Sequence, residues 1–112
     1  MTHTLPPAEV LLLQSLVTST AHGIASRVLA KSGGGNLKLF AFDAGQGLTE
    51  HSSPFEALVL VLDGALILTI GSARIRATPG TIVRMPADVP HAVDAPEEAR
   101  MLLIMLRDRQ DA

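Results

Sequence analysis

The sequence feature that most constrains this fold is a regular spacing of short apolar runs after residue 22. Each run is five to eight residues long, and residues such as Gly, Pro, Asn and Asp separate it from the next. Runs of this length between turn residues are typical of the strands of a β-sandwich or a β-barrel. The predicted strands are 24–31, 37–43, 55–62, 65–70, 73–78, 81–85, 91–95 and 99–106.

The turn residues predict how these strands connect. Asp63-Gly64 lies between two apolar runs, and both residue types tolerate the positive φ angles of a tight hairpin turn. Gly71-Ser72 is a second candidate hairpin turn. We therefore expect an all-β fold, a single antiparallel β-barrel or jelly roll over residues 21–112, in one domain. Pro6 and Pro7 suit the first turn of a helix, and they predict a short helix at 7–16 within an N-terminal covering segment, residues 1–20.

Two predicted strands are apolar on both faces. Residues 73–77 alternate between apolar and polar, so one face of that strand meets water. Residues 55–62 and 99–106 carry apolar side chains at both parities, apart from Glu56 and Arg100. One face can fill the barrel, but the other needs cover. Either residues 1–20 or a second copy of the chain can supply it, and we expect a homodimer.

Composition excludes several functional classes. The chain of 112 residues has no cysteine, so it forms no disulfide and no thiolate metal site. Its formal net charge of −2, with no Trp or Tyr, argues against a nucleic-acid partner. The longest apolar runs fall far short of the ~20 residues of a membrane helix, so no membrane partner is expected. The N-terminus lacks the pattern of a signal peptide, which predicts a cytoplasmic protein.

Three polar residues are candidates for a functional site. His51 ends a glycine-containing loop, Glu56 begins the strand predicted at 55–62, and His91 begins the strand predicted at 91–95. Pro54 interrupts the chain between His51 and Glu56, so both side chains could converge. Two imidazoles and one carboxylate would form a facial triad suited to Fe(II), Mn(II) or Zn(II). The alternative is two ordinary loop histidines and a glutamate at a strand end.

Two segments resemble the sequence motifs of the cupin family. The first cupin motif is a Gly, five residues, His-x-His, a few residues, Glu, about six residues and a Gly. Residues 45–64, GQGLTEHSSPFEALVLVLDG, are similar to it. The second motif is a Gly, five residues, Pro-x-Gly, two residues, His, three residues and Asn. Residues 80–91, GTIVRMPADVPH, are similar to that.

The resemblance implies a small stand-alone cupin and points to a metal site. Cupins bind a divalent metal through the two histidines and the glutamate of motif one and the histidine of motif two. The matching residues here are His51, Glu56 and His91, which would hold Fe, Mn, Ni or Zn. Ser53 stands where the second histidine belongs, so one of the four usual ligands is missing.

Other positions depart from the motifs too. Asp88 replaces the glycine of motif two and Ala95 replaces its asparagine. The interval between Glu56 and Gly64 is one residue longer than the motif prescribes.

Three functions fit these observations. The first is a barrel that binds a small-molecule ligand of unassigned specificity, with His51 and His91 as hydrogen-bonding groups and a divalent metal in addition if the triad forms. The second is a metal-dependent small-molecule enzyme of the oxygenase, isomerase or hydrolase type. The third is a dimer that binds no ligand. The cupin fold supports all three, so the choice depends on the geometry of the site.

Overall fold

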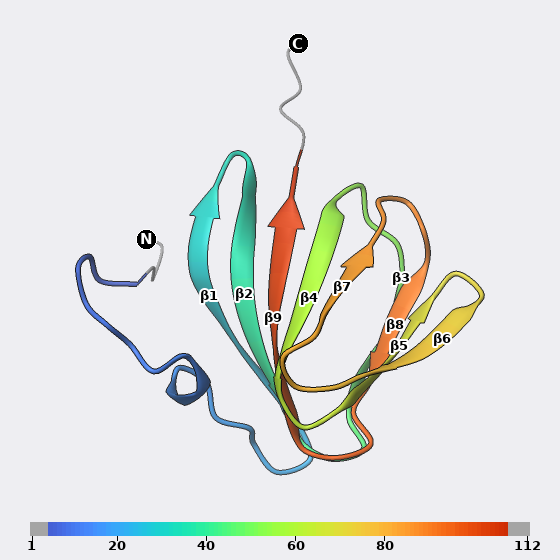
Figure 1. The fold of residues 1–112 in the computed structure, drawn as a ribbon, viewed down its shortest axis with the longest axis horizontal. Coiled ribbons are helices and arrows are strands. Elements are labelled where there is room, and N and C mark those ends of the chain that lie inside the picture. The colour runs from blue at the N-terminus through green and yellow to red at the C-terminus, as the bar shows by residue number, and fades with distance from the viewer. Residues whose placement is uncertain (1–4, 108–112) are drawn as a thin grey trace.

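The computed structural model describes residues 5–107 as nine strands in two antiparallel sheets (Figure 1). The five-stranded sheet has the order β1-β2-β9-β4-β7, and the four-stranded sheet has the order β3-β8-β5-β6. The strands are β1 (Ile24–Ser32), β2 (Gly35–Phe42), β3 (Gly47–His51), β4 (Glu56–Asp63), β5 (Leu66–Ile70), β6 (Ala73–Ala77), β7 (Ile82–Met85), β8 (His91–Asp94) and β9 (Ala99–Leu106). The predicted all-β antiparallel barrel is confirmed.

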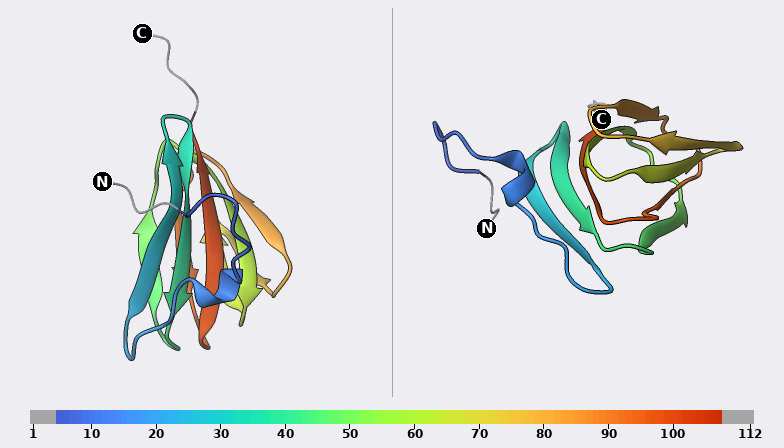
Figure 2. Two further views of the ribbon diagram at one scale, coloured as in Figure 1. Left: turned by 90° about the vertical axis from the view of Figure 1, so that its left-hand side faces the viewer. Right: turned by 60° about the horizontal axis from the view of Figure 1, so that its bottom comes forward.

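The two sheets enclose the main core of the protein (Figure 2, right). Side chains alternate between the two faces of a strand, and along β4 the buried positions are Ala57, Val59 and Val61. These residues pack with inward-facing residues of both sheets, including Met101 on β9 and Leu68 on β5. Packed side chains therefore fill the barrel.

A second core lies on the outer face of the five-stranded sheet. It contains Val17, Leu29, Leu39, Ala41 and Leu102, all buried. The N-terminal segment lies across this face, as Figure 2 (left) shows. The segment thus covers part of the outward apolar side of β1, β2 and β9.

The N-terminal segment is not the predicted helix at 7–16. Its only helical element among the described residues is a 3-10 turn, η1 (Leu13–Ser15). Ala8 has a positive φ of 60°, Leu12 is extended, and no side chain caps the turn. A short helix without a cap is marginal in water, so packing of the segment against the sheet decides its conformation. The backbone N–H of Leu5, for example, donates to the carbonyl of Leu29.

The predicted strands agree with eight of the nine observed strands, with small shifts at their ends. The missing prediction is β3, which lies in a stretch that the sequence indicated as a loop. Its residues Thr49, Glu50 and His51 are exposed, and it lies at an edge of the four-stranded sheet. A short, polar edge strand lacks the hydrophobic pattern by which a strand is recognised.

Both predicted hairpin turns are present. Gly64 has φ +66° between β4 and β5, and Gly71 has φ +58° between β5 and β6. At Gly64 a Cβ atom would lie 2.1 Å from the carbonyl oxygen of Glu98. This position therefore requires glycine for space as well as for conformation.

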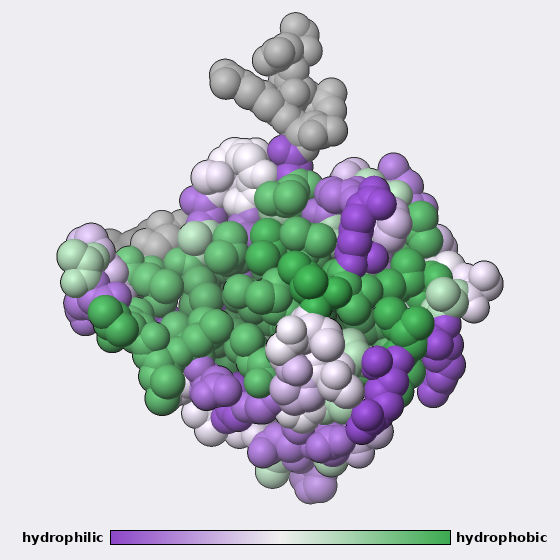
Figure 3. Space-filling view, viewed as in Figure 1, coloured by the Kyte–Doolittle hydropathy of each residue, from purple (hydrophilic) through white to green (hydrophobic). Residues whose placement is uncertain are grey.

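A broad apolar surface lies over the five-stranded sheet in Figure 3. One row of paired residues crosses the outer face of this sheet through Leu39, Leu102, Leu60 and Ile82. The exposed fraction of these residues rises from 0% at Leu39 and 8% at Leu102 to 58% at Ile82. The outer face of the sheet is therefore covered near β2 and β9 but exposed to solvent at β7. Within residues 5–107 no helix is long and apolar enough to cross a membrane.

Candidate functional site

His51 and His91 lie side by side at one end of the four-stranded sheet. His51 ends β3, His91 begins β8, and the two residues pair in the antiparallel register. Their ring centroids are 4.4 Å apart with an interplanar angle of 67°, an edge-to-face contact. His91 is buried and its neighbour on the other side is Ile70, whereas His51 is exposed.

A β-bulge brings His51 to the same side as His91. The register shifts between Leu48 and His51, where two residues of β3, Thr49 and Glu50, lie opposite one residue of β8, Ala92. Leu48 packs against the barrel core, and in a regular strand a residue three positions later, such as His51, would point away from the core. The bulge is the local feature that pairs the two imidazoles.

Backbone carbonyls set the same tautomer in the imidazole rings of His51 and His91. His51 Nδ1 lies 2.8 Å from the Thr49 carbonyl oxygen, and His91 Nδ1 lies 3.1 Å from the Val89 carbonyl oxygen. A carbonyl oxygen can only accept, so each Nδ1 carries the proton and donates it. In the neutral rings the lone pair then lies on Nε2. The site therefore offers two adjacent imidazole acceptors.

Glu56 does not converge with the histidines, contrary to the expectation from the sequence. It shares its strand face with Leu58 and Leu60, whereas Ala57 and Val59 face the core. Pro54 does interrupt the chain, but β4 begins at Glu56 with its outward position. The side chain of Glu56 thus lies on the outer face of the five-stranded sheet.

Glu56 has two partners on that outer face. Its Oε1 accepts a hydrogen bond from Arg84 Nε on β7, and its Oε2 accepts one from the backbone N–H of Ala87 at 3.1 Å. The Arg84 guanidinium and, after it, the Ala87 N–H hold the pKa of Glu56 below its usual value. These contacts give Glu56 a role in tying β4 to the segment that precedes His91.

At the start of β4 it is the side chain of Ala57, not that of Glu56, that faces the barrel interior. It is 4% exposed and pairs with Met85 on β7 and Met105 on β9. Six residues separate Ala57 from Gly64, which is the interval that the first cupin motif places between its glutamate and its glycine. The extra residue between Glu56 and Gly64 was the sequence signal for this assignment.

Ser53 and Asp88 form the junction between the two motif segments. The Ser53 hydroxyl accepts from the backbone N–H of Phe55 at 3.3 Å, and its carbonyl accepts from the N–H of Asp88 at 2.8 Å. Asp88 has φ 63°, the left-handed conformation that glycine would adopt more easily. The backbone of the second motif is therefore kept although its glycine is replaced.

These donors do not fit the three-ligand metal site inferred from the sequence. His51 and His91 supply two nitrogens, but the third predicted ligand, Glu56, faces away and is bound by Arg84 and Ala87. Within residues 5–107 no group of three His, Cys, Asp or Glu side chains is placed to hold one ion. Metal binding at His51, Glu56 and His91 remains a prediction from the resemblance.

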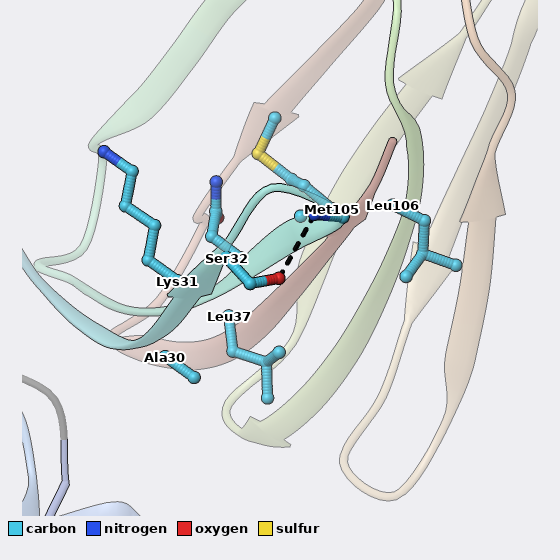
Figure 4. A pocket seen from close by; sticks show the side chains of 9 residues that line it. Ala30, Lys31, Ser32, Leu37, Met105 and Leu106 are labelled. Atoms are coloured by element: carbon cyan, nitrogen blue, oxygen red, sulfur yellow. Dashed lines mark hydrogen bonds between the residues drawn. The ribbon is translucent and has the colours of Figure 1, made fainter. Parts of the chain in front are cut away.

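Two cavities lie elsewhere on the described part of the protein. One, of about 270 Å³, lies at the tip of the β1–β2 hairpin and the end of β9, where Lys31, Leu37 and Met105 line it (Figure 4). The other, of about 300 Å³, has Gln46, Arg74 and Asp94 among its lining residues. Neither cavity is lined by His51 or His91.

Comparison with known proteins gives consistent results. A family model for the cupin domain matches residues 38–106. A conserved protein of unknown function from Streptococcus pyogenes is 32% identical, over 97% of this chain and 96% of that one, with a TM-score of 0.91. A cupin superfamily protein from Desulfitobacterium hafniense is 29% identical, over 96% of this chain and 99% of that one, with a TM-score of 0.88.

A third structure shares only part of its length. The match to a cupin 2 conserved barrel domain protein from Leptotrichia buccalis has 29% identity and a TM-score of 0.81, and covers 84% of this chain but 46% of that one. No curated protein matches the sequence. Because the family model spans more than half of the chain, and the Streptococcus pyogenes protein matches almost all of it, this chain belongs to the cupin domain family.

Proposed function

We propose that this cupin is a binding protein for a small molecule, and that His51 and His91 form its recognition site. The observation that carries the proposal is the pair of Nε2 atoms on two adjacent imidazole rings, each left with its lone pair because Nδ1 donates to a backbone carbonyl. Fixed acceptors beside apolar side chains such as Ile70 are typical of small-molecule sites. The ligand class is a small, partly apolar molecule with N–H or O–H donors.

A metal-dependent enzyme is the second candidate, and the same pair of atoms favours it. Two neutral imidazole nitrogens bind Fe, Mn, Ni or Zn, and the remaining coordination positions would be open to water or substrate. The metal would act as a Lewis acid at that point. The position of Glu56 weakens this candidate, because a site of two neutral ligands has lower affinity than one with a carboxylate.

Thermal unfolding tests both candidates. Chelator-treated protein is melted with a panel of small hydrogen-bond donors, and separately with Zn²⁺, Ni²⁺, Mn²⁺ and Fe²⁺ up to about a millimolar, since a ligand of the folded state raises the melting temperature by mass action. We expect compounds whose effect is lost in His51→Ala and in His91→Ala. The matched control is His22→Asn, because His22 lies in the turn just before β1, is exposed, and has a left-handed φ that Asn tolerates.

The pattern of results separates the candidates. A stabilising compound whose effect needs both site histidines and not His22 supports the binding protein. A metal ion with the same dependence supports the metal site that the enzyme would require. Stabilisation that persists in both His51→Ala and His91→Ala, or the absence of any stabilising compound or ion, contradicts the site.

A further inference from the structure

We propose that Glu56 is a positioning residue that orients His91 from outside the barrel, and that Ala57 determines which ligands the two imidazoles accept. The second part rests on the proposed recognition site at His51 and His91. The starting observation is the one-residue offset on β4, which turns the carboxylate of Glu56 outward and the methyl group of Ala57 inward.

Glu56 and Ser53 bind two amides of the segment before His91. The Glu56 carboxylate accepts from Ala87 N–H at 3.1 Å, and the Ser53 carbonyl accepts from Asp88 N–H at 2.8 Å. These two successive amides belong to the segment that connects β7 to β8. Glu56 at the start of β4 and Ser53 just before it thus hold this segment at two adjacent points.

The anchored segment leads directly to His91. His91 Nδ1 donates to the Val89 carbonyl at 3.1 Å, so this carbonyl sets both the tautomer and the direction of the ring. Val89 directly follows the anchored pair Ala87-Asp88. Because the anchors fix the backbone on which the Val89 carbonyl lies, Glu56 acts on the imidazole without touching it.

Ala57 places a methyl group, and no charge, on the barrel-facing side of β4. From β4, only Ala57, Val59 and Val61 belong to the barrel core, so this strand contributes no charged group to the interior. Two neutral imidazoles without a carboxylate suit hydrogen-bond donors better than a divalent cation. A glutamate at position 57 would add an anionic ligand facing the barrel interior and reverse that preference.

The first test follows the imidazole rings by two-dimensional NMR of ring nitrogens and their attached carbons. In Glu56→Ala we expect the Nδ1 and Nε2 signals of His91 to shift, because the Val89 carbonyl loses its support. Glu56→Gln should restore part of the change, since the amide oxygen still accepts from Ala87 N–H. Glu97→Ala removes a carboxylate from an exposed ion pair with Arg76 and is the control that should leave the rings unchanged.

This test separates positioning from mere stabilisation. A Glu56→Ala protein that melts at a lower temperature but keeps the wild-type ring signals overturns the positioning role. Ring signals that change equally in Glu56→Ala and Glu97→Ala overturn it too. The readout does not depend on finding a ligand, so it stands even if the proposed function fails.

The second test adds the carboxylate. In Ala57→Glu we expect the affinity for Zn²⁺, measured by calorimetry, to exceed that of the wild-type protein by about tenfold or more. Leu58→Glu, which adds a carboxylate to the outer face of the same strand, should bind Zn²⁺ as the wild type does. No gain in a folded Ala57→Glu protein, or an equal gain in Leu58→Glu, would overturn the assignment of Ala57.

Burial of a new carboxylate could unfold the Ala57→Glu variant. In that case folding that is restored by Zn²⁺ supports the assignment, because metal binding then supplies folding free energy. A variant that Zn²⁺ does not refold contradicts it.

Discussion

Asp43 shows at the residue scale how one carboxylate joins two parts of the backbone. Its Oδ2 accepts from the N–H of His22 at 2.7 Å, and its Oδ1 accepts from the N–H of Ala44 at 2.9 Å. The His22 N–H, followed by the Ala44 N–H, lowers the pKa of Asp43 below its usual value. The carboxylate therefore fixes the approach to β1 beside the end of β2.

These contacts predict a dependence of stability on pH. A carboxyl group with a lowered pKa stabilises the folded protein above its unfolded-state pKa of about 3.9, and this contribution is lost as the pH falls through the folded-state pKa. Asp43→Asn should lower the free energy of unfolding at pH 7. The difference from the wild type should shrink below about pH 4, in urea unfolding at each pH. A difference that is constant from pH 7 to low pH would contradict this role of the charge.

At the residue scale, the sequence predicts the two histidines of the site but not the strand face on which Glu56 lies. The motif spacing located His51 and His91, which the structure brings together. It did not locate the face of Glu56, because consecutive residues of a strand point to opposite sides and the motif allows a variable interval. The fixed interval to Gly64 points to Ala57 and was the better guide, since Gly64 is held by its positive φ and its contact with Glu98.

Glycine positions in the turns and loops allow a graded test at the scale of elements. Gly64 has a positive φ and no space for a Cβ atom, Gly45 has a positive φ and open space, and Gly33 has neither restriction. We expect alanine to cost about 2 kcal/mol or more at Gly64, about 1 kcal/mol at Gly45 and less than about 0.5 kcal/mol at Gly33. Denaturant unfolding measures the three values. Equal costs would mean that crowding at the β4–β5 turn is not limiting.

Elements differ in how well the sequence predicts them. The Asp63-Gly64 hairpin and the long apolar strands were predictable, because turn chemistry and hydrophobic periodicity are local properties. Strand β3 was not, since its identity depends on pairing with β8 across more than forty residues of sequence. The N-terminal segment was also misjudged, because its proline pair fits a helix while its apolar residues are held by the sheet beneath them.

The exposed apolar row on the five-stranded sheet bears on the whole molecule. The N-terminal segment covers Leu39 and Leu102, but Ile82 is 58% exposed and Leu106, on the same outer face, is 47% exposed. A surface of this kind on a two-layer barrel favours a symmetric contact with a second copy of the chain. We expect a homodimer through this face.

Light scattering at micromolar concentration tests the dimer. The wild-type protein should have twice the monomer mass, and Ile82→Glu and Leu106→Glu should each give monomers. Ile75→Glu is the matched control, because Ile75 is also exposed but lies on β6 of the other sheet. A wild-type monomer, or a dimer that survives both charged substitutions on the five-stranded sheet, would contradict the interface. Deletion of residues 1–20 should then cause aggregation, since that segment would be the only cover.

The β-bulge in β3 has a consequence for how this protein can diverge. Removal of one residue from Thr49-Glu50 would straighten the strand and keep both Leu48 and His51 on the core-facing side, because His51 would then be two positions after Leu48. The two imidazoles therefore stay paired whether β3 is bulged at its present length or regular and one residue shorter. A descendant that keeps this length but loses the bulge would turn His51 outward, and would lose the site although it keeps both histidines and the whole barrel.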